Sequence, residues 1–258
     1  MAKFHLHHED AFAWLDRQEP RSFDVTITDP PYTGLVHDNV ANVYSAKSKK
    51  LKRRLFIPID FAPFSPEEVE RLTLELLRVT KRWVVIFCAL EQIGLYAAAA
   101  GPKCYVRSGC YRRAQSTPQL SGDRPGQAVE GVVILHRTGK KRWNGGGGHA
   151  FWNASRDRGE RLHPTQKPVS LMLDLVEQFS DTSETVLDPF MGSGTTGVAA
   201  LRVGRSFVGV EKAEKAYQDA CDRLAAEAMN HDLEHHRRRQ MVMFPPTHTA
   251  GEIAECSR

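Results

Sequence analysis

Two short motifs in this sequence combine residue types that could carry out chemistry. The first is the run Asp29-Pro30-Pro31-Tyr32, which directly follows an apolar, β-branched stretch at 23–28. Two consecutive prolines fix φ twice and remove two backbone donors, so their carbonyl oxygens remain acceptors in a rigid geometry. Asp29 and the Pro30 carbonyl could each accept one hydrogen of an exocyclic amine on a flat base. Tyr32 could stack on that base, a contact that contributes about 1–3 kcal/mol.

The chemistry that this first motif predicts is methylation of an amine. Asp29 need not be a strong base, because a methylated nitrogen is cationic and loses its proton readily. The rate would come mainly from placing the nitrogen, the methyl group and the sulfur in line. A base inside a duplex cannot reach such a cleft, so the base must be flipped out. A proline turn that closes a buried strand, with Tyr32 in the core, is the alternative interpretation of this motif alone.

The second motif is a glycine-rich loop, DPFMGSGTTG, over residues 188–197. Its G-x-G-x-x-G pattern, with Glu211 about 20 residues after the first glycine, also fits a dinucleotide-dependent oxidoreductase. Asp188 argues against that alternative, because a carboxylate repels a pyrophosphate but pairs with an ammonium group. S-adenosylmethionine has an ammonium group for Asp188 or the nearby loop and a ribose diol for Glu211. A phosphate-binding P-loop is excluded, since no Lys follows the glycines.

The elements that must position these motifs alternate between strands and helices. Apolar runs predict strands at 23–28, 83–89, 129–136, 185–187 and 206–210. Helical spacing and end signals predict helices at 65–80, from 89 to about 101, and at 168–179, 194–203 and 213–229. This alternation predicts an α/β fold with a doubly wound, mostly parallel sheet and helices on both faces.

Length and composition are those of one globular domain. The chain has 258 residues, of which 41% are hydrophobic and 26% charged. No apolar run approaches the roughly 20 residues that span a membrane, and the N-terminus has no signal-peptide core. Five scattered cysteines show no metal spacing and favour reduced thiols, so we expect a cytoplasmic protein without a metal. We expect a catalytic domain at 1–230 and a basic, disordered tail at 231–258.

Basic residues concentrate in segments that are expected to be loops. The formal net charge of +4 is too small to prove a nucleic-acid partner, but clustered cations could follow phosphates. The loops 33–63, 112–126 and 138–162 are therefore expected to recognise the target. The candidate DNA-binding residues are Lys49, Lys50, Arg53, Arg54, Arg112, Arg113, Lys140 and Lys141. A solvated loop is an equally good explanation of any single cluster.

Together, these residues resemble the amino-methyltransferases of DNA, which modify N6 of adenine or N4 of cytosine. The resemblance covers most of residues 20–228. Asp29 to Tyr32 matches the catalytic motif, Asp188 to Thr195 the cofactor loop, and HPTQKP at 163–168 the segment that lines the methionine end. The catalytic motif precedes the cofactor loop, which is the permuted order of the beta group. The resemblance implies a Rossmann-like, seven-stranded sheet with one antiparallel strand, which binds cofactor at the carboxyl ends of the strands.

The resemblance also implies a role for each matched residue. The catalytic residues would be Asp29, Pro30, Pro31 and Tyr32. The residues that bind S-adenosylmethionine would be Asp29, Thr165, Gln166, Lys167, Asp188, Phe190, Gly192, Ser193, Gly194, Thr195 and Glu211. An initial Asp in the catalytic motif favours N6 of adenine, because cytosine-N4 members more often begin it with Ser; cytosine remains open. The segment before residue 163 is too short for an independent recognition domain, so we expect a short or relaxed target sequence.

The expected partner is double-stranded DNA with its target base flipped out, and no membrane. A homodimer, a separately encoded restriction nuclease and a phage or prophage origin are all compatible with the sequence. Methylation of an amine or amide on RNA or protein, and a catalytically silent DNA-binding protein, remain alternatives. Trp143, Phe151 and Trp152 are as compatible with stacking near a flipped base as with core packing.

Overall fold

A mixed β-sheet forms the middle layer of the protein, and the computed structural model describes residues 3–32, 63–114, 125–155, 166–229 and 254–257. Within these residues the sheet has nine strands in the order β6-β4-β5-β3-β2-β7-β8-β1-β9. The strands are β1 (Phe4–His8), β2 (Val25–Thr28), β3 (Trp83–Cys88), β4 (Tyr105–Arg113), β5 (Val129–His136), β6 (Phe151–Ala154), β7 (Thr185–Asp188), β8 (Ser206–Glu211) and β9 (Ala254–Ser257).

The direction of the strands confirms the predicted fold class. Strand β5 runs antiparallel to both of its neighbours, β3 and β4, and every other pairing in the described sheet is parallel. The sheet has nine strands and not seven, because β6 and β9 extend its two edges. The sequence did not predict β4, since this strand buries only Tyr111 and carries Arg, Ser and Gly at other positions.

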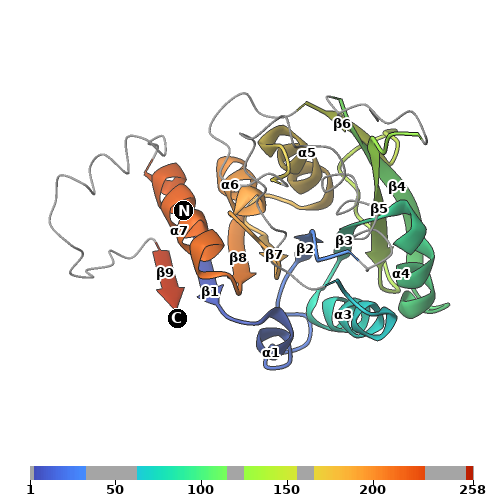
Figure 1. Ribbon diagram of the computed structural model, residues 1–258, viewed down its shortest axis with the longest axis horizontal. Coiled ribbons are helices and arrows are strands. Elements are labelled where there is room, and N and C mark those ends of the chain that lie inside the picture. The colour runs from blue at the N-terminus through green and yellow to red at the C-terminus, as the bar shows by residue number, and fades with distance from the viewer. Residues whose placement is uncertain (1–2, 33–62, 115–124, 156–165, 230–253, 258) are drawn as a thin grey trace, which may run out of the picture.

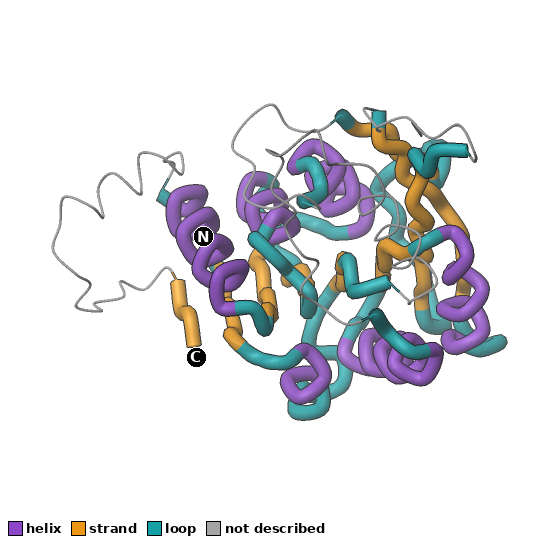
Figure 2. The backbone as a smooth tube through the Cα atoms, in the orientation of Figure 1, coloured by secondary structure: helices purple, strands orange, loops and turns teal. Residues whose placement is uncertain are grey.

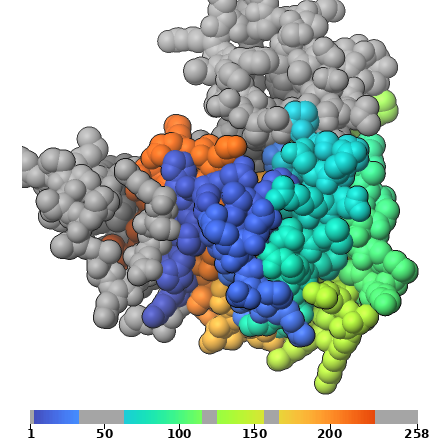
Figure 3. Space-filling model, turned by 90° about the horizontal axis from the view of Figure 1, so that it is seen from below, coloured from blue at the N-terminus to red at the C-terminus, as the bar shows by residue number. Residues whose placement is uncertain are grey.

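Helices cover both faces of the sheet (Figures 1 and 2). They are α1 (Ala11–Leu15), α3 (Pro66–Val79), the short 3-10 helix η1 (Leu90–Gln92), α4 (Ile93–Ala100), α5 (Val169–Phe179), α6 (Thr195–Arg202) and α7 (Glu214–Ala228). Helices α5, α6 and α7 pack on one face, and α1, α3 and α4 on the other. Figure 3 shows this second face from below, with α1 in blue, α3 in cyan and α4 in green side by side.

The core explains why the predicted strands are continuous apolar runs. Along β3, Val85 joins the hydrophobic cluster under α5, α6 and α7, whereas Val84 and Ile86 join the cluster under α3 and α4. Both faces of this strand are therefore buried, as in most parallel sheets that helices cover on both sides. Helix α3 begins with a capping box, in which the Ser65 hydroxyl accepts from the Glu68 N–H and the Glu68 carboxylate accepts from the Ser65 N–H.

The chain reverses its winding direction between the adjacent strands β2 and β7. From β2 the chain continues through α3, on one face, to β3; from β7 it continues through α6, on the other face, to β8. Such a switch point opens a crevice at the carboxyl ends of the two strands, which is where open α/β sheets bind ligands. The motif at residues 29–32 follows β2 and the glycine loop follows β7, so both lie at this crevice.

Two further expectations concern the ends and surface of the chain. Of the expected tail at 231–258, only 254–257 lie within the described residues, and they form β9, which pairs with β1; the expectation of disorder does not hold for these four residues. No helix in the described part of the chain is long and apolar enough to cross a membrane.

Candidate active site

Four side chains form a closed ring of polar contacts at the end of β2. The Lys167 ammonium lies 2.5 Å from Asp29 Oδ2 and 3.0 Å from Glu130 Oε2. The Tyr32 hydroxyl lies 3.2 Å from Asp29 Oδ1 and 3.0 Å from the same Glu130 oxygen. Its single O–H can donate to only one of them at a time. Both oxygens of Asp29 therefore have a donor within reach, and each of those donors also contacts Glu130.

Burial and charge set the protonation states in this ring. Burial raises the pKa of Asp29, with Glu130 adding to the effect and the Lys167 ammonium opposing it. Burial also acts to raise the pKa of Glu130, but Lys167 and Arg113 outweigh it, so the pKa of this carboxyl is lowered. The two carboxylates raise the pKa of Lys167 against the effect of burial, and burial raises the pKa of Tyr32 well above its ordinary value. Lys167 is thus an ammonium and Tyr32 a neutral hydroxyl.

Asp188 joins the glycine loop to the strand that carries Asp29. Its carboxylate accepts hydrogen bonds from Thr28 Oγ1 at 2.8 Å, Thr196 Oγ1 at 2.7 Å and the Phe190 N–H at 3.1 Å. Asp188 is only 2% exposed, and burial raises its pKa to about 7. The sequence assigned the ammonium group of a cofactor to Asp188 or the nearby loop, and that assignment stays a prediction. In the structure three protein donors surround the Asp188 carboxylate, which fixes the glycine loop against the end of β2.

The glycine loop combines a strained backbone with close packing. Gly192 and Gly194 have φ of +52° and +78°, which a residue with a side chain rarely adopts. A Cβ on Gly194 would lie 2.7 Å from Leu224 Cδ1, whereas one on Gly192 would meet no described atom within 4 Å. Gly194 is therefore required for packing against α7, and Gly192 leaves its backbone open to close approach.

Glu211 ends β8 beside the same loop. One carboxylate oxygen accepts from the Gly192 N–H at 3.0 Å and the other from the Ala213 N–H at 2.7 Å. Burial raises its pKa. A carboxylate offers about four lone-pair positions, so Glu211 keeps acceptor capacity for a ligand while the two amides fix its orientation.

The remaining predicted residues of the loop have distinct surroundings. Ser193 and Thr195 are buried, and Arg223 of α7 donates to the Ser193 carbonyl at 2.6 Å and lies 3.2 Å from the Thr195 hydroxyl. Phe190 is half-buried and packs edge-on against Phe64, with ring centroids 5.7 Å apart. Gln166 is half-buried next to Lys167, and Thr165 lies outside the described residues.

The described candidate DNA-binding residues divide between the carboxyl ends and the amino ends of the parallel strands. Arg112 and Arg113 end β4, at the same carboxyl ends of the parallel strands where Asp29 lies. Arg112 is exposed, and Arg113 Nε lies 3.6 Å from Glu130 Oε1. Lys140 and Lys141 follow β5, which runs antiparallel. They therefore emerge at the amino ends of the parallel strands, where Lys141 lies over the Tyr105 ring. These two lysines therefore lie at the opposite ends of the strands from Asp29, and their role in DNA binding stays a prediction. The candidates Lys49, Lys50, Arg53 and Arg54 lie outside the described residues.

Two of the three aromatic residues at 143–152 pack in the core. Trp143 and Trp152 both contact Phe179 of α5, at centroid distances of 4.9 and 6.4 Å. The Trp152 indole N–H donates to the Gln178 side chain at 3.0 Å. Phe151 is 53% exposed on β6 and is the one that remains free to stack.

Sequence reasoning missed Glu130, Arg113 as its partner, and Arg223. Glu130 carried a signal, because it is a charged residue near the start of a strand that is otherwise apolar. Arg223 carried none, since a charged residue on a long, partly exposed helix is ordinary.

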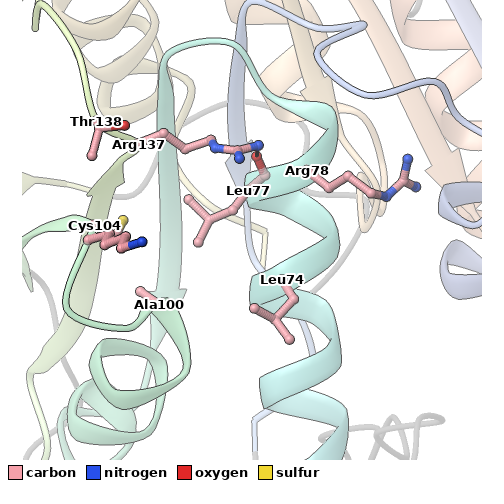
Figure 4. A pocket seen from close by; sticks show the side chains of 8 residues that line it. Leu74, Leu77, Arg78, Ala100, Cys104, Arg137 and Thr138 are labelled. Carbon is pink, nitrogen blue, oxygen red and sulfur yellow. Dashed lines mark hydrogen bonds between the residues drawn. The ribbon is translucent and has the colours of Figure 1, made fainter.

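One measured cavity lies away from this site. It has a volume of about 350 Å³ and lies between α3, α4 and the end of β5 (Figure 4). Its lining residues are Leu74, Leu77, Arg78, Ala100, Lys103, Cys104, Arg137 and Thr138. None of them is among the candidate catalytic or cofactor-binding residues, so this cavity is not the crevice at the switch point.

Comparison with known proteins agrees with this geometry. The sequence profile of the DNA methylase family, whose members act at adenine N6 and cytosine N4, matches residues 23–222. The chain is 25% identical to the type II methyltransferase M2.DpnII of Streptococcus pneumoniae over 254 residues, or 87% of this chain and 91% of that protein. It is 48% identical to YubD of Escherichia coli K12, a protein named as a methylase, over 68 residues that span 30% of YubD.

Two solved structures share the fold. The complex of M1.HpyAVI with S-adenosylmethionine superposes with a TM-score of 0.60 at 24% identity, covering 86% of this chain and 98% of that one. The cytosine-N4-specific PvuII DNA methyltransferase superposes with a TM-score of 0.64 at 13% identity, covering 94% and 93%. The profile match includes Asp29, the glycine loop and Glu211, and it spans most of the described sheet; this chain belongs to the DNA methylase family of N6-adenine and N4-cytosine methyltransferases.

Proposed function

We propose that the protein transfers a methyl group from S-adenosylmethionine to N6 of an adenine that is flipped out of double-stranded DNA. The observation that carries the proposal is the hydrogen bond between Thr28 and Asp188, which fixes the motif at residues 29–32 directly beside the glycine loop. A base amine at Asp29 and a methyl donor at the loop would then meet in one crevice. Positioning of this kind accounts for a large share of the rate of group transfer.

The residues of the loop fit S-adenosylmethionine. Gly192 leaves open space beside its backbone, and Glu211 keeps lone pairs for hydroxyl donors next to it. Lys167 and Phe190 would contribute a cation and an aromatic face from the two sides of the crevice. Bound there, S-adenosylmethionine would supply an electrophilic methyl group. Because Asp188 is engaged from beneath, we propose that it supports the cofactor only by holding the loop.

The role of Asp29 follows from its position in the ring of contacts. The Asp29 side chain is 27% accessible, against 10% for Lys167 and 15% for Glu130. Its carboxylate would accept a hydrogen from the amine and turn the nitrogen lone pair toward the methyl group. The raised pKa of Asp29 makes it a better acceptor than an ordinary aspartate, and the cationic product would lose its proton readily. Tyr32 would lie along the base.

Adenine is favoured over cytosine by the residue that opens the motif. The Asp that opens the motif resembles that of the adenine-N6 members of the family, whereas the cytosine-N4 members more often have Ser at this position. Cytosine N4 is the second candidate, because the same pair of acceptors suits either amine. Membership of a methylase family excludes a dinucleotide-dependent oxidoreductase. A homodimer and a separately encoded nuclease remain proposals about partners.

The experiment is methyl transfer from labelled S-adenosylmethionine to unmodified DNA, followed by digestion to nucleosides and mass spectrometry. We expect labelled N6-methyladenine. Labelled N4-methylcytosine would keep the reaction and correct the base. Label in RNA or protein, with none in DNA, would overturn the proposed substrate.

A further inference from the structure

Glu130 is a largely buried carboxylate near the start of a mostly apolar strand. It is the second residue of β5, whose beginning lies at the carboxyl edge of the parallel strands because β5 runs antiparallel. Its side chain is only 15% exposed. Removing a carboxylate from water costs several kcal/mol even after relaxation, and partners must compensate for that cost. Two apolar residues, Val129 and Gly131, flank it in the strand.

The partners of Glu130 are the two groups that touch Asp29. Its Oε2 atom lies 3.0 Å from the Lys167 ammonium and 3.0 Å from the Tyr32 hydroxyl. Its Oε1 atom faces Arg113 Nε at 3.6 Å. Glu130 therefore anchors both donors from behind, while Asp29 meets them from the crevice side.

Charge balance gives this arrangement a chemical consequence. In the ring and its nearest cation, two carboxylates face Lys167 and Arg113. Without the Glu130 charge, Lys167 would pair with Asp29 undivided, and Arg113 would lose the carboxylate that faces it. An acceptor held this way binds a new donor less well, because an undivided ion pair competes with the incoming amine.

We propose, on the basis of the methyl transfer proposed above, that Glu130 is a positioning residue that shares Lys167 and Tyr32 with Asp29 and so keeps the Asp29 carboxylate available to the amine of the base. It acts through Asp29 and does not touch the base. Losing it slows the reaction and changes how the rate depends on pH.

The pH effect has a definite sign. The charge of Glu130 raises the pKa of Asp29, so removing it lowers that pKa. Methyl transfer needs Asp29 ionised, so the acid limb of the rate profile moves to lower pH. Among the described residues, the other titratable groups near Asp29 are the thiol of Cys88, whose pKa burial raises to about 12, the phenol of Tyr96, whose pKa burial also raises, and Asp188. All three are present in every variant below and cannot cause a difference between them.

The test compares Glu130→Gln with a matched variant of another buried ion pair. Glu184 contacts Arg82 at 2.5 Å with 21% of its side chain exposed, and it lies at the amino ends of the strands, away from the site. The full-length variants are assayed for methyl transfer to DNA at saturating substrate from about pH 5 to pH 9, with thermal unfolding measured in parallel. We expect Glu130→Gln to lower kcat by about tenfold or more and to shift its acid limb downward. We expect Glu184→Gln to lower the Tm and to leave the acid limb of the pH dependence of kcat where it is in the wild type.

A third variant protects the test against misfolding. Glu130→Asp keeps the charge but draws it back by one methylene from the Lys167 ammonium and the Tyr32 hydroxyl, so kcat falls while the acid limb moves less than in Glu130→Gln. An unmoved limb in the folded Glu130→Gln variant overturns the inference, whatever its Tm. If Glu130→Gln does not fold, a wild-type kcat in Glu130→Asp overturns it instead. Wild-type protein without any transfer to DNA overturns the proposed function, which is a different result.

Discussion

Thr28, the last residue of β2, donates a 2.8 Å hydrogen bond to Asp188, the last residue of β7. This bond crosses the switch point of the sheet and ties the catalytic motif to the glycine loop. Both residues are fully or almost fully buried. Together with the backbone pairing of β2 and β7, this bond fixes the motif at residues 29–32 relative to the glycine loop.

Replacing Thr28 by Val keeps the shape of the side chain and removes this bond. We expect the free energy of unfolding to fall by about 1–3 kcal/mol, because a buried carboxylate loses one of its donors. Affinity for S-adenosylmethionine should fall as well. Thr26→Val is the matched control, since Thr26 is buried on the same strand and its hydroxyl contacts Thr80 at 2.6 Å, away from the loop. Urea unfolding and calorimetric titration measure the two effects. Equal loss of cofactor affinity in both variants would contradict a special role for the strand-end bond.

Asp188 should make the protein less stable as the pH rises toward neutrality. Burial raises its pKa from 3.8 to about 7. In this interval the folded protein holds a proton that the unfolded chain has released, so the stabilisation is complete below about pH 4 and is lost as the pH rises through about 7. Asp188→Asn, which has no titrating proton, should show a smaller fall of Tm between these limits than the wild type. Parallel slopes of Tm against pH for the two proteins would show that Asp188 titrates normally.

Most of the fold could be predicted from the sequence, and the limits are physical. The runs that formed β2, β3, β5, β7 and β8 are apolar because helices bury both of their faces, so composition alone revealed them. The direction of β5 could not be predicted, because an apolar run has the same composition in either direction. For this reason the sequence did not show at which ends of the strands Lys140 and Lys141 emerge, and Glu130 was not recognised as facing the site.

The candidate site shows the same division. Motif spacing identified Asp29, Tyr32, the glycines and Glu211, because each stands at the end of a strand that the sequence marks clearly. The contact of Asp188 with Thr28 depends on which strands are neighbours, and spacing does not contain that information.

Asp29→Ala should reduce methyl transfer by about 10²–10⁴-fold, the usual contribution of a positioned proton acceptor. Affinity for S-adenosylmethionine should stay within a few-fold of the wild type, because Lys167 keeps its contact with Glu130 when Asp29 is removed. Asp24→Asn is the control. Asp24 stands before the other end of β2, where it pairs with Lys81 at 2.8 Å and caps the Thr185 N–H. Single-turnover transfer and calorimetric titration of all three proteins check the prediction, and wild-type activity in Asp29→Ala would remove Asp29 from the mechanism.

DNA should bind at the carboxyl ends of the parallel strands, where Arg112 lies. Arg112 is exposed at the carboxyl end of β4, on the same side as Asp29, whereas the equally exposed Lys141 lies at the amino ends of the strands. Arg112→Ala should weaken DNA binding and lower the slope of log K against log salt by about 1, because one phosphate contact is lost. Lys141→Ala removes the same charge and should change neither quantity. Fluorescence anisotropy with a labelled duplex at several salt concentrations separates the two. A matching loss in Lys141→Ala would mean that the duplex also reaches the amino ends of the strands. A base flipped into the crevice at Asp29 would then require the DNA to wrap around the sheet.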